Sequence, residues 1–120
     1  MNLSQITKTL VSEIKLTEIQ AKIFLHIVIN GKMNTSKIAN DLKISLDDAT
    51  KNSKKLIELG GFIDMPNDEF EAMHPRFTAV NMYRKMCERE QKEFKKNLNV
   101  DNIGVALEVS YDDARTKYNK

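Results

Sequence analysis

The chain has 120 residues, 41% hydrophobic content and a formal net charge of +2, which provides core enough for one small domain. Its single cysteine, Cys87, excludes an internal disulfide and any zinc site with several cysteine ligands. No apolar run reaches about 18 residues, and the start Met1-Asn2-Leu3-Ser4 lacks the basic-then-apolar layout of a secretion signal, so we expect a cytoplasmic protein without membrane contact.

Two helices are expected in the first quarter of the chain. The first carries an apolar stripe, with Ser4 as its expected cap. The members of that stripe are Leu3, Ile6, Leu10 and Ile14. Thr17 and Gln20 form a capping box that opens a second helix, which runs to about Ile29 and is apolar on nearly every side, so it should lie buried at the centre. His26 lies within it without closely spaced partner ligands, which favours a core or half-buried histidine over a metal ligand.

The middle of the chain predicts two short amphipathic helices joined by a tight turn. The hydroxyl residues Thr35 and Ser36 are placed to cap the first of them. Residues 43–44 form the turn, and Ser45 with Asp48 is a second capping signal that opens the next helix. The expected inward-facing residues of the two helices are Ile38, Ala39, Leu42, Ala49, Ser53, Leu56 and Leu59.

A β-hairpin is predicted directly after these helices. Gly60-Gly61 ends the second helix, because glycine adopts the left-handed conformation that closes a helix without strain. Strand-like runs at 62–65 and 70–73 flank the turn-forming residues 66–69. A helix–turn–helix followed by a hairpin is the winged-helix plan, which presents its second helix, here about Leu46–Leu59, to a DNA groove.

A long helix is expected from about Thr78 to Lys96. Val80, Cys87 and Phe94 recur every seven residues, which is the spacing of a coiled-coil seam. We therefore expect this helix to form a homodimer interface, with packing on the protein's own core as the alternative. The expected interface residues are Val80, Tyr83, Cys87 and Phe94. A lone cysteine in such a stripe is interpreted as a small core residue in preference to a redox-sensing thiol.

The segment after this helix allows two interpretations. Asn99 is placed to cap a further helix, whereas apolar residues also alternate between Val105 and Tyr111 as in a half-buried strand. The length of the segment favours the helix. Its apolar stripe would contain Val100, Ile103, Leu107, Tyr111, Ala114 and Tyr118. We thus expect a mainly α (α+β) fold, with a winged helix-turn-helix and an extra N-terminal helix at 1–77 and C-terminal dimerisation helices at 78–120.

Charge is distributed unevenly along the chain. Residues 1–61 carry a net +3, residues 62–74 carry −4, and residues 75–98 carry +4. Phosphate would be attracted to the two basic segments and repelled by the hairpin between them. Asp47 and Asp48, at the start of the second motif helix, suit the helix dipole, and an aspartate can also accept a hydrogen bond from cytosine. The expected DNA contacts are Thr35, Ser36, Lys37, Thr50, Lys51, Lys54, Lys55 and Arg76.

Several segments resemble the N-terminal domain of the TrmB-type archaeal transcriptional regulators, over about residues 15–96. They are Leu16–Leu25, Ile38-Ala39, Leu56–Gly60 and Phe70–Pro75. The helix–turn–helix pattern itself is shared by many winged-helix groups, including MarR-like proteins. The resemblance implies an intracellular DNA-binding regulator that dimerises through its C-terminal helix.

Two departures from that family stand out. The recognition helix of the family commonly begins with arginine and hydroxyl residues, where this chain has Leu46-Asp47-Asp48. The larger members carry a sugar-binding domain after the winged helix, and this chain is too short to hold one, so no small-molecule effector domain is expected.

The function expected from the sequence is that of a sequence-specific transcriptional regulator that binds double-stranded DNA as a homodimer. The alternative is a winged-helix module that holds a protein partner and does not read DNA. No glycine-rich phosphate loop, nucleophile beside a base, or paired catalytic carboxylates are evident, so we expect no enzymatic activity, catalytic residues, metal or cofactor.

Overall fold

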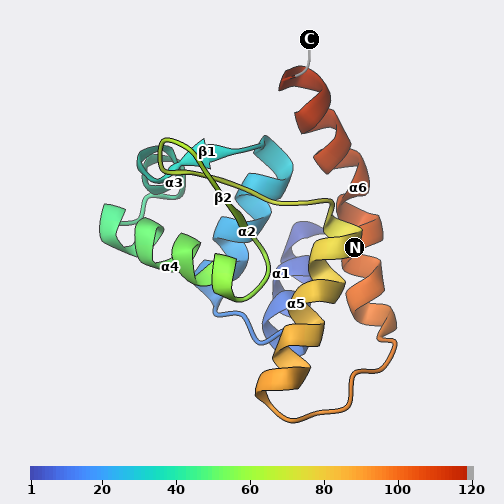
Figure 1. The fold of residues 1–120 in the computed structure, drawn as a ribbon. Helices are drawn as coiled ribbons and strands as arrows, with labels where there is room; N and C mark the ends of the chain where they lie inside the picture. Colours follow the sequence, from blue (N-terminus) through green and yellow to red (C-terminus); the bar gives the residue numbers. More distant parts are fainter. Residues whose placement is uncertain (119–120) are drawn as a thin grey trace.

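The computed structural model describes the backbone of residues 1–118 and the side chains of residues 1–116 (Figure 1). In this part of the chain, a small three-stranded antiparallel sheet accompanies a mainly helical fold. The helices are α1 (Leu3–Glu13), α2 (Glu18–Asn30), α3 (Thr35–Leu42), α4 (Leu46–Glu58), α5 (Pro75–Arg89) and α6 (Leu98–Tyr118). The strands are β1 (Met33–Asn34), β2 (Ile63–Met65) and β3 (Glu69–Glu71). Among the described residues, no helix combines the length and the apolar character needed to cross a membrane.

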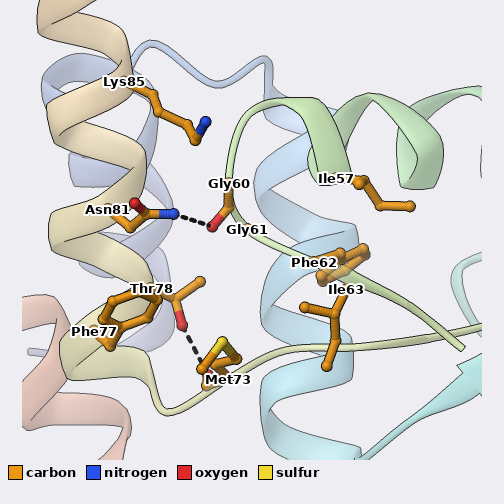
Figure 2. A pocket seen from close by; sticks show the side chains of 10 residues that line it. All are labelled: Ile57, Gly60, Gly61, Phe62, Ile63, Met73, Phe77, Thr78, Asn81 and Lys85. Atoms are coloured by element: carbon orange, nitrogen blue, oxygen red, sulfur yellow. Dashed lines mark hydrogen bonds between the residues drawn. The ribbon is translucent and has the colours of Figure 1, made fainter.

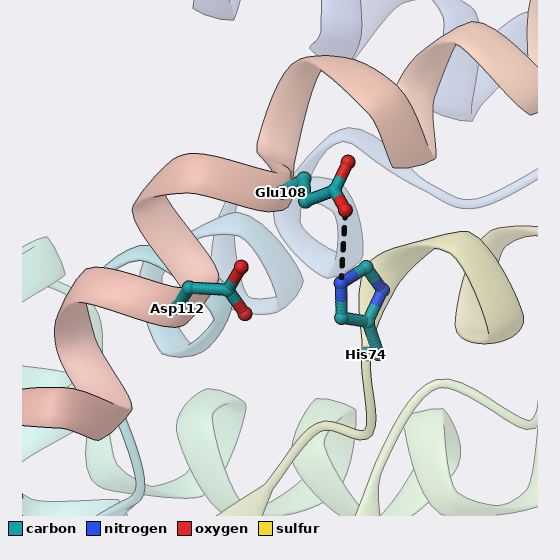
Figure 3. Close-up of side chains that lie close together, drawn as sticks. All are labelled: His74, Glu108 and Asp112. Carbon is teal, nitrogen blue, oxygen red and sulfur yellow. Dashed lines mark ion pairs between the residues drawn. The ribbon is translucent and has the colours of Figure 1, made fainter.

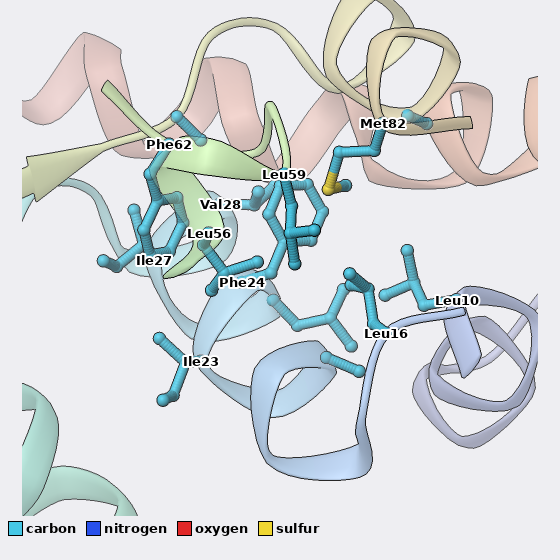
Figure 4. Packing of buried hydrophobic residues seen from close by; sticks show 14 of the residues in the cluster. Leu10, Leu16, Ile23, Phe24, Ile27, Val28, Leu56, Leu59, Phe62 and Met82 are labelled. Carbon is cyan, nitrogen blue, oxygen red and sulfur yellow. The ribbon is translucent and has the colours of Figure 1, made fainter. Parts of the chain in front are cut away.

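Helix α2 is the buried centre of the fold, as its sequence predicts. Its start is closed by the predicted capping box, in which the Thr17 hydroxyl accepts from the Gln20 backbone N–H and the Gln20 side chain accepts from the Thr17 N–H. Phe24 is fully buried and lies among side chains of α1, α4, α5 and the segment after α4 (Figure 4). His26 is half-buried at the edge of this core, as expected, and its Nε2 lies 2.8 Å from an Asp41 carboxylate oxygen.

Helix α1 covers one side of α2, but its cap differs from the prediction. Asn2, not Ser4, closes the start, because Asn2 and Gln5 form a complete capping box that begins two residues earlier. Ile6 and Leu10 are buried as expected, so the extra N-terminal helix adds directly to the core.

The predicted tight turn joins α3 and α4. Lys43 adopts the left-handed conformation (φ 56°) that ends α3. The cap of α3 is Asn34, whose side chain accepts from the Lys37 N–H at 2.9 Å. The prediction that Thr35 or Ser36 caps this helix is therefore wrong. Ser45 caps α4 as predicted, with its hydroxyl 3.0 Å from the backbone nitrogen of Asp48.

The predicted hairpin is formed by β2 and β3, with shorter strands than expected. Asn67 and Asp68 both have positive φ at its turn, a conformation that asparagine and aspartate tolerate better than most residues. Strand β1, only two residues long, was not predicted; it pairs with β3 and gives the strand order β1-β3-β2. Phe70 of β3 packs on Phe62, which stacks in turn on Phe24.

Helix α5 is shorter than the predicted helix and begins earlier. It ends at Arg89, Gln91 has positive φ, and the chain then leads into α6, which runs back alongside α5 (Figure 1). Phe94 therefore lies in the connection, 49% exposed, with its ring against Tyr83. Cys87 is buried at 1% exposure within its own chain. Val80, Cys87 and Phe94 therefore do not form one helical seam, because α5 ends at Arg89, before Phe94 is reached.

Helix α6 confirms the helical interpretation of the C-terminal segment and excludes the strand. Asn97, not Asn99, caps it by accepting from the N–H groups of Asn99 and Val100. The predicted stripe packs inward: Val100, Ile103, Leu107 and Ala114 are buried and Tyr111 is half-buried. The side chain of Tyr118, the last member of that stripe, lies outside the described residues.

Candidate nucleic-acid interface

Helix α4 presents one side to the core and the other to solvent. Ala49, Ser53 and Leu56 are fully buried at three- and four-residue spacing. On the remaining surface, Lys51, Lys54 and Lys55 are exposed and Thr50 is half-buried. Figure 1 shows the start of α4 at the left edge of the molecule, on the opposite side of the view from α6. The structure thus brings four of the predicted DNA contacts together on one solvent-facing helix.

A shallow groove of about 440 Å³ runs along this side of α4 and reaches the start of α2. It is lined by Gln20, Lys51, Asn52, Lys54, Lys55 and Glu58. The Lys55 ammonium forms an ion pair with Glu58 at 3.1 Å, whereas no ion pair is formed by Lys51 or Lys54 within the described residues. These two lysines are therefore free to meet an anion. We refer to Lys51, Lys54 and Lys55 as the α4 lysines.

The first turn of α4 is acidic. Asp47 and Asp48 are exposed, and Leu46 beside them has 54% of its surface exposed. Each carboxylate stabilises the helix by roughly 0.3–1 kcal/mol through the helix dipole, which is sufficient structural reason for both. Charge on the outer side of α4 is therefore ordered along its axis, acidic at the start and basic in the middle.

The start of α3 offers a second set of predicted contacts. Ser36 and Lys37 are exposed and Thr35 is half-buried. The Lys37 ammonium lies 3.2 Å from an Asp41 oxygen on the next turn of α3. The hydrogen bond from His26, opposed in part by burial and assisted by Lys37, holds the pKa of Asp41 below its usual value. Part of the positive charge of Lys37 is thus already neutralised.

The structure separates Arg76 from the other predicted DNA contacts. Its guanidinium donates to Glu108 of α6 through Nε at 3.2 Å and Nη2 at 3.0 Å. Its backbone lies so close to Gly104 that a Cβ there would stand 2.6 Å from the Arg76 Cα. Figure 1 shows the start of α5 beside α6 and on the other side of the view from α4. Arg76 joins two helices here and is not part of the surface around the α4 lysines.

Three groups that sequence reasoning missed meet beside Arg76. His74, Glu108 and Asp112 place one nitrogen and two carboxylate oxygens within 4.8 Å of one another (Figure 3). His74 Nδ1 accepts the Arg76 backbone N–H at 3.2 Å, so the proton of the neutral ring is on Nε2, which faces Glu108. The imidazole therefore acts as the cap of α5, and its Nε2 lies 3.9 Å from a Glu108 oxygen. Glu108 and Asp112 lie one turn apart on α6, but His74 caps α5, so no local pattern could bring all three together.

The hairpin keeps most of its negative charge. Asp64 and Asp68 are exposed and Glu69 is half-buried, and none of the three pairs with a cation in the described part of the chain. Glu71 forms an ion pair with Arg115 of α6.

Comparison with protein-family models, with curated proteins and with solved structures gave no match to this chain. Function is therefore inferred from the fold and from the placement of these charges.

Proposed function

We propose that this protein is a winged-helix transcriptional regulator that binds double-stranded DNA with α4 in the major groove. The observation that carries the proposal is the order of elements: α3, a tight turn, α4, and then the β2–β3 hairpin. Strand β3 of this hairpin also pairs with β1, the strand that directly precedes α3 in the sequence. This order anchors α4 through one buried stripe and leaves its other side to solvent. A helix held in this way is the reading element of helix–turn–helix proteins.

The surface charges indicate how such a helix would lie on DNA. Lys51 and Lys54, which form no ion pair within the described residues, would neutralise phosphates of the DNA backbone, and Thr50 and the start of α3 would add hydrogen bonds. Asp47 would face base edges, where a carboxylate can accept from cytosine. The acidic hairpin would be repelled from the backbone, so the contact area is centred on α3 and α4.

In this proposal two copies associate along α6. Leu98, Val105 and Val109 are 67%, 53% and 71% exposed, although all three are large apolar residues. With Asn102 they follow a four-three-four spacing on the outer side of α6, which is the repeat of a helix–helix seam. This α6 stripe replaces the predicted seam through Cys87, because that thiol is already buried within its own chain.

A salt titration of duplex DNA binding tests the DNA part of the proposal. The wild type should bind at low salt, with a log–log slope of about −0.9 per phosphate neutralised. The double change Lys51→Ala and Lys54→Ala should weaken binding and flatten the slope by roughly 2. The matched control Lys92→Ala and Lys95→Ala removes the same charge from the α5–α6 connection and should leave the slope unchanged. Absence of binding to any duplex at low salt would refute the regulator and favour the protein-interaction alternative.

Sedimentation tests the assembly. Changing Val105 and Val109 to glutamate places two charges in the α6 stripe and should shift a dimer to monomer, since burying unpaired charge is costly. Folding should be unaffected, because both side chains already face solvent. The matched control changes Leu3 and Val11, two exposed apolar residues of α1, to glutamate; it adds the same charge away from the α6 stripe and should leave the dimer intact. A wild type that is monomeric at high concentration would contradict association along α6.

A further inference from the structure

A cavity of about 200 Å³ lies between the end of α4, the start of β2 and the first turns of α5 (Figure 2). The link Gly60-Gly61 forms one wall, and Thr78, Asn81 and Lys85 lie along α5 on the other. None of the α4 lysines lines it, so the proposed DNA contacts give it no role.

One end of this cavity is apolar and open to solvent. Ile63, Met73 and Phe77 line it with 41%, 47% and 54% of their surfaces exposed, and the half-buried Ile57 and the buried Phe62 complete the lining. Three exposed large hydrophobic side chains from separate elements therefore meet around one hollow. An apolar occupant would remove their surface from water, at roughly 25 cal/mol per Å².

The other end of the cavity is polar, and Lys85 is its one charged lining residue. The Thr78 hydroxyl donates to the backbone carbonyls of Met73 and His74. The Asn81 side chain donates to the Gly60 carbonyl at 3.2 Å and accepts from Arg84. Lys85 forms no ion pair within the described residues, and its stem extends over Gly60 (Figure 2). The polar group that remains for an occupant is therefore an ammonium.

We propose that this cavity binds a small apolar monocarboxylate, with its hydrocarbon part against Ile63, Met73 and Phe77 and its carboxylate at the ammonium of Lys85. The volume holds roughly seven non-hydrogen atoms at about 30 Å³ each, which is close to the eight of a six-carbon acid. The site is smaller than the usual 300–1,000 Å³ of drug-sized pockets, so the ligand is small and its affinity is of millimolar order. Hexanoate is the probe of this size and charge.

Methyl-detected NMR of the full chain tests the site directly and does not depend on DNA binding. Titration with hexanoate should shift the methyl signals of Ile63 and Met73 to saturation. Hexylamine should bind at least about tenfold more weakly, because its ammonium would meet that of Lys85. A lack of saturation, or equal binding of the two probes, would overturn the proposal.

Two variants separate the charged end from the apolar end. Lys85→Met should weaken hexanoate about tenfold without weakening hexan-1-ol, and the control Lys95→Met, an exposed lysine outside the cavity, should change neither. Phe77→Gln should weaken both probes, and the 54% exposure of Phe77 makes this change compatible with folding. Unchanged hexanoate binding in both variants would refute the site. Ile63 and Met73 signals that respond to protein concentration and not to hexanoate would assign the cavity to a second copy of the chain.

Discussion

Arg115 links three parts of the fold, and its removal should be among the most damaging single changes on α6. Its guanidinium donates to the carbonyls of Ile27 and Val28 at the end of α2, pairs with Glu71 of β3, and stacks on the Tyr111 ring with 3.7 Å between Cζ and the ring centroid. The side chains of the ion pair are each 18% exposed, so solvent screens them little.

The expected cost of Arg115→Met follows from these contacts. Breaking a buried ion pair costs about 3–5 kcal/mol, and the residual exposure of this pair favours the lower end, about 3 kcal/mol. Such a loss is a large part of the 5–15 kcal/mol that stabilises a typical domain. Urea unfolding measures it as a lower midpoint with an unchanged slope.

Arg84→Met is the matched control for this experiment. Arg84 pairs with Glu88 on the surface of α5, where the two side chains are 46% and 64% exposed, so its loss should cost less than about 1 kcal/mol. Equal costs for the two variants would refute the reasoning that burial of the Arg115 pair determines its importance.

Two further predictions concern charge. Because the pKa of Asp41 is lowered mainly by the His26 hydrogen bond, its contribution to stability is present above the ordinary value of 3.8 and is lost as the pH falls below that value through the lowered pKa. The unfolding midpoints of Asp41→Asn between about pH 5 and 3 should therefore depend less on pH than those of the wild type. Parallel pH profiles would contradict this. Changing Asp68 and Glu69 to lysine should strengthen non-specific duplex binding, measured by anisotropy at fixed salt, and unchanged affinity would show that the hairpin lies away from the DNA.

Local chemistry explains which features the sequence predicts correctly. The caps at Thr17 and Ser45 depend on a side chain and a backbone group three residues apart, so a short pattern contains all the information. The left-handed end of α4 at Gly60 is equally local. The observed caps of α1 and α3 lie one or two residues before the predicted ones, because an asparagine that precedes the expected hydroxyl residues accepts the capping hydrogen bond.

Long-range packing explains what the sequence does not predict. Strand β1 is two residues long, too short for any periodicity, and it exists because β3 offers it an edge. After α5 ends at Arg89, α6 returns along it, and Gly104 of α6 lies directly against the backbone of Arg76. The same contact places Glu108 beside Arg76, so a basic residue that the sequence assigns to DNA forms an ion pair with α6 at the surface.

The order of charge along α4 fixes the orientation that the proposed complex requires. With a rise of 1.5 Å per residue, Asp47 lies about 6 Å along the axis from Lys51 and about 10 Å from Lys54. At physiological salt the screening length is about 8 Å, so the acidic turn weakens the attraction of Lys51 for phosphate more than that of Lys54. A helix polarised in this way is favoured on DNA when its middle lies against the sugar–phosphate backbone and its first turn lies over base edges, where a carboxylate can accept from the amino group of a cytosine and is farther from phosphate. The acidic first turn is therefore compatible with groove binding only in that orientation.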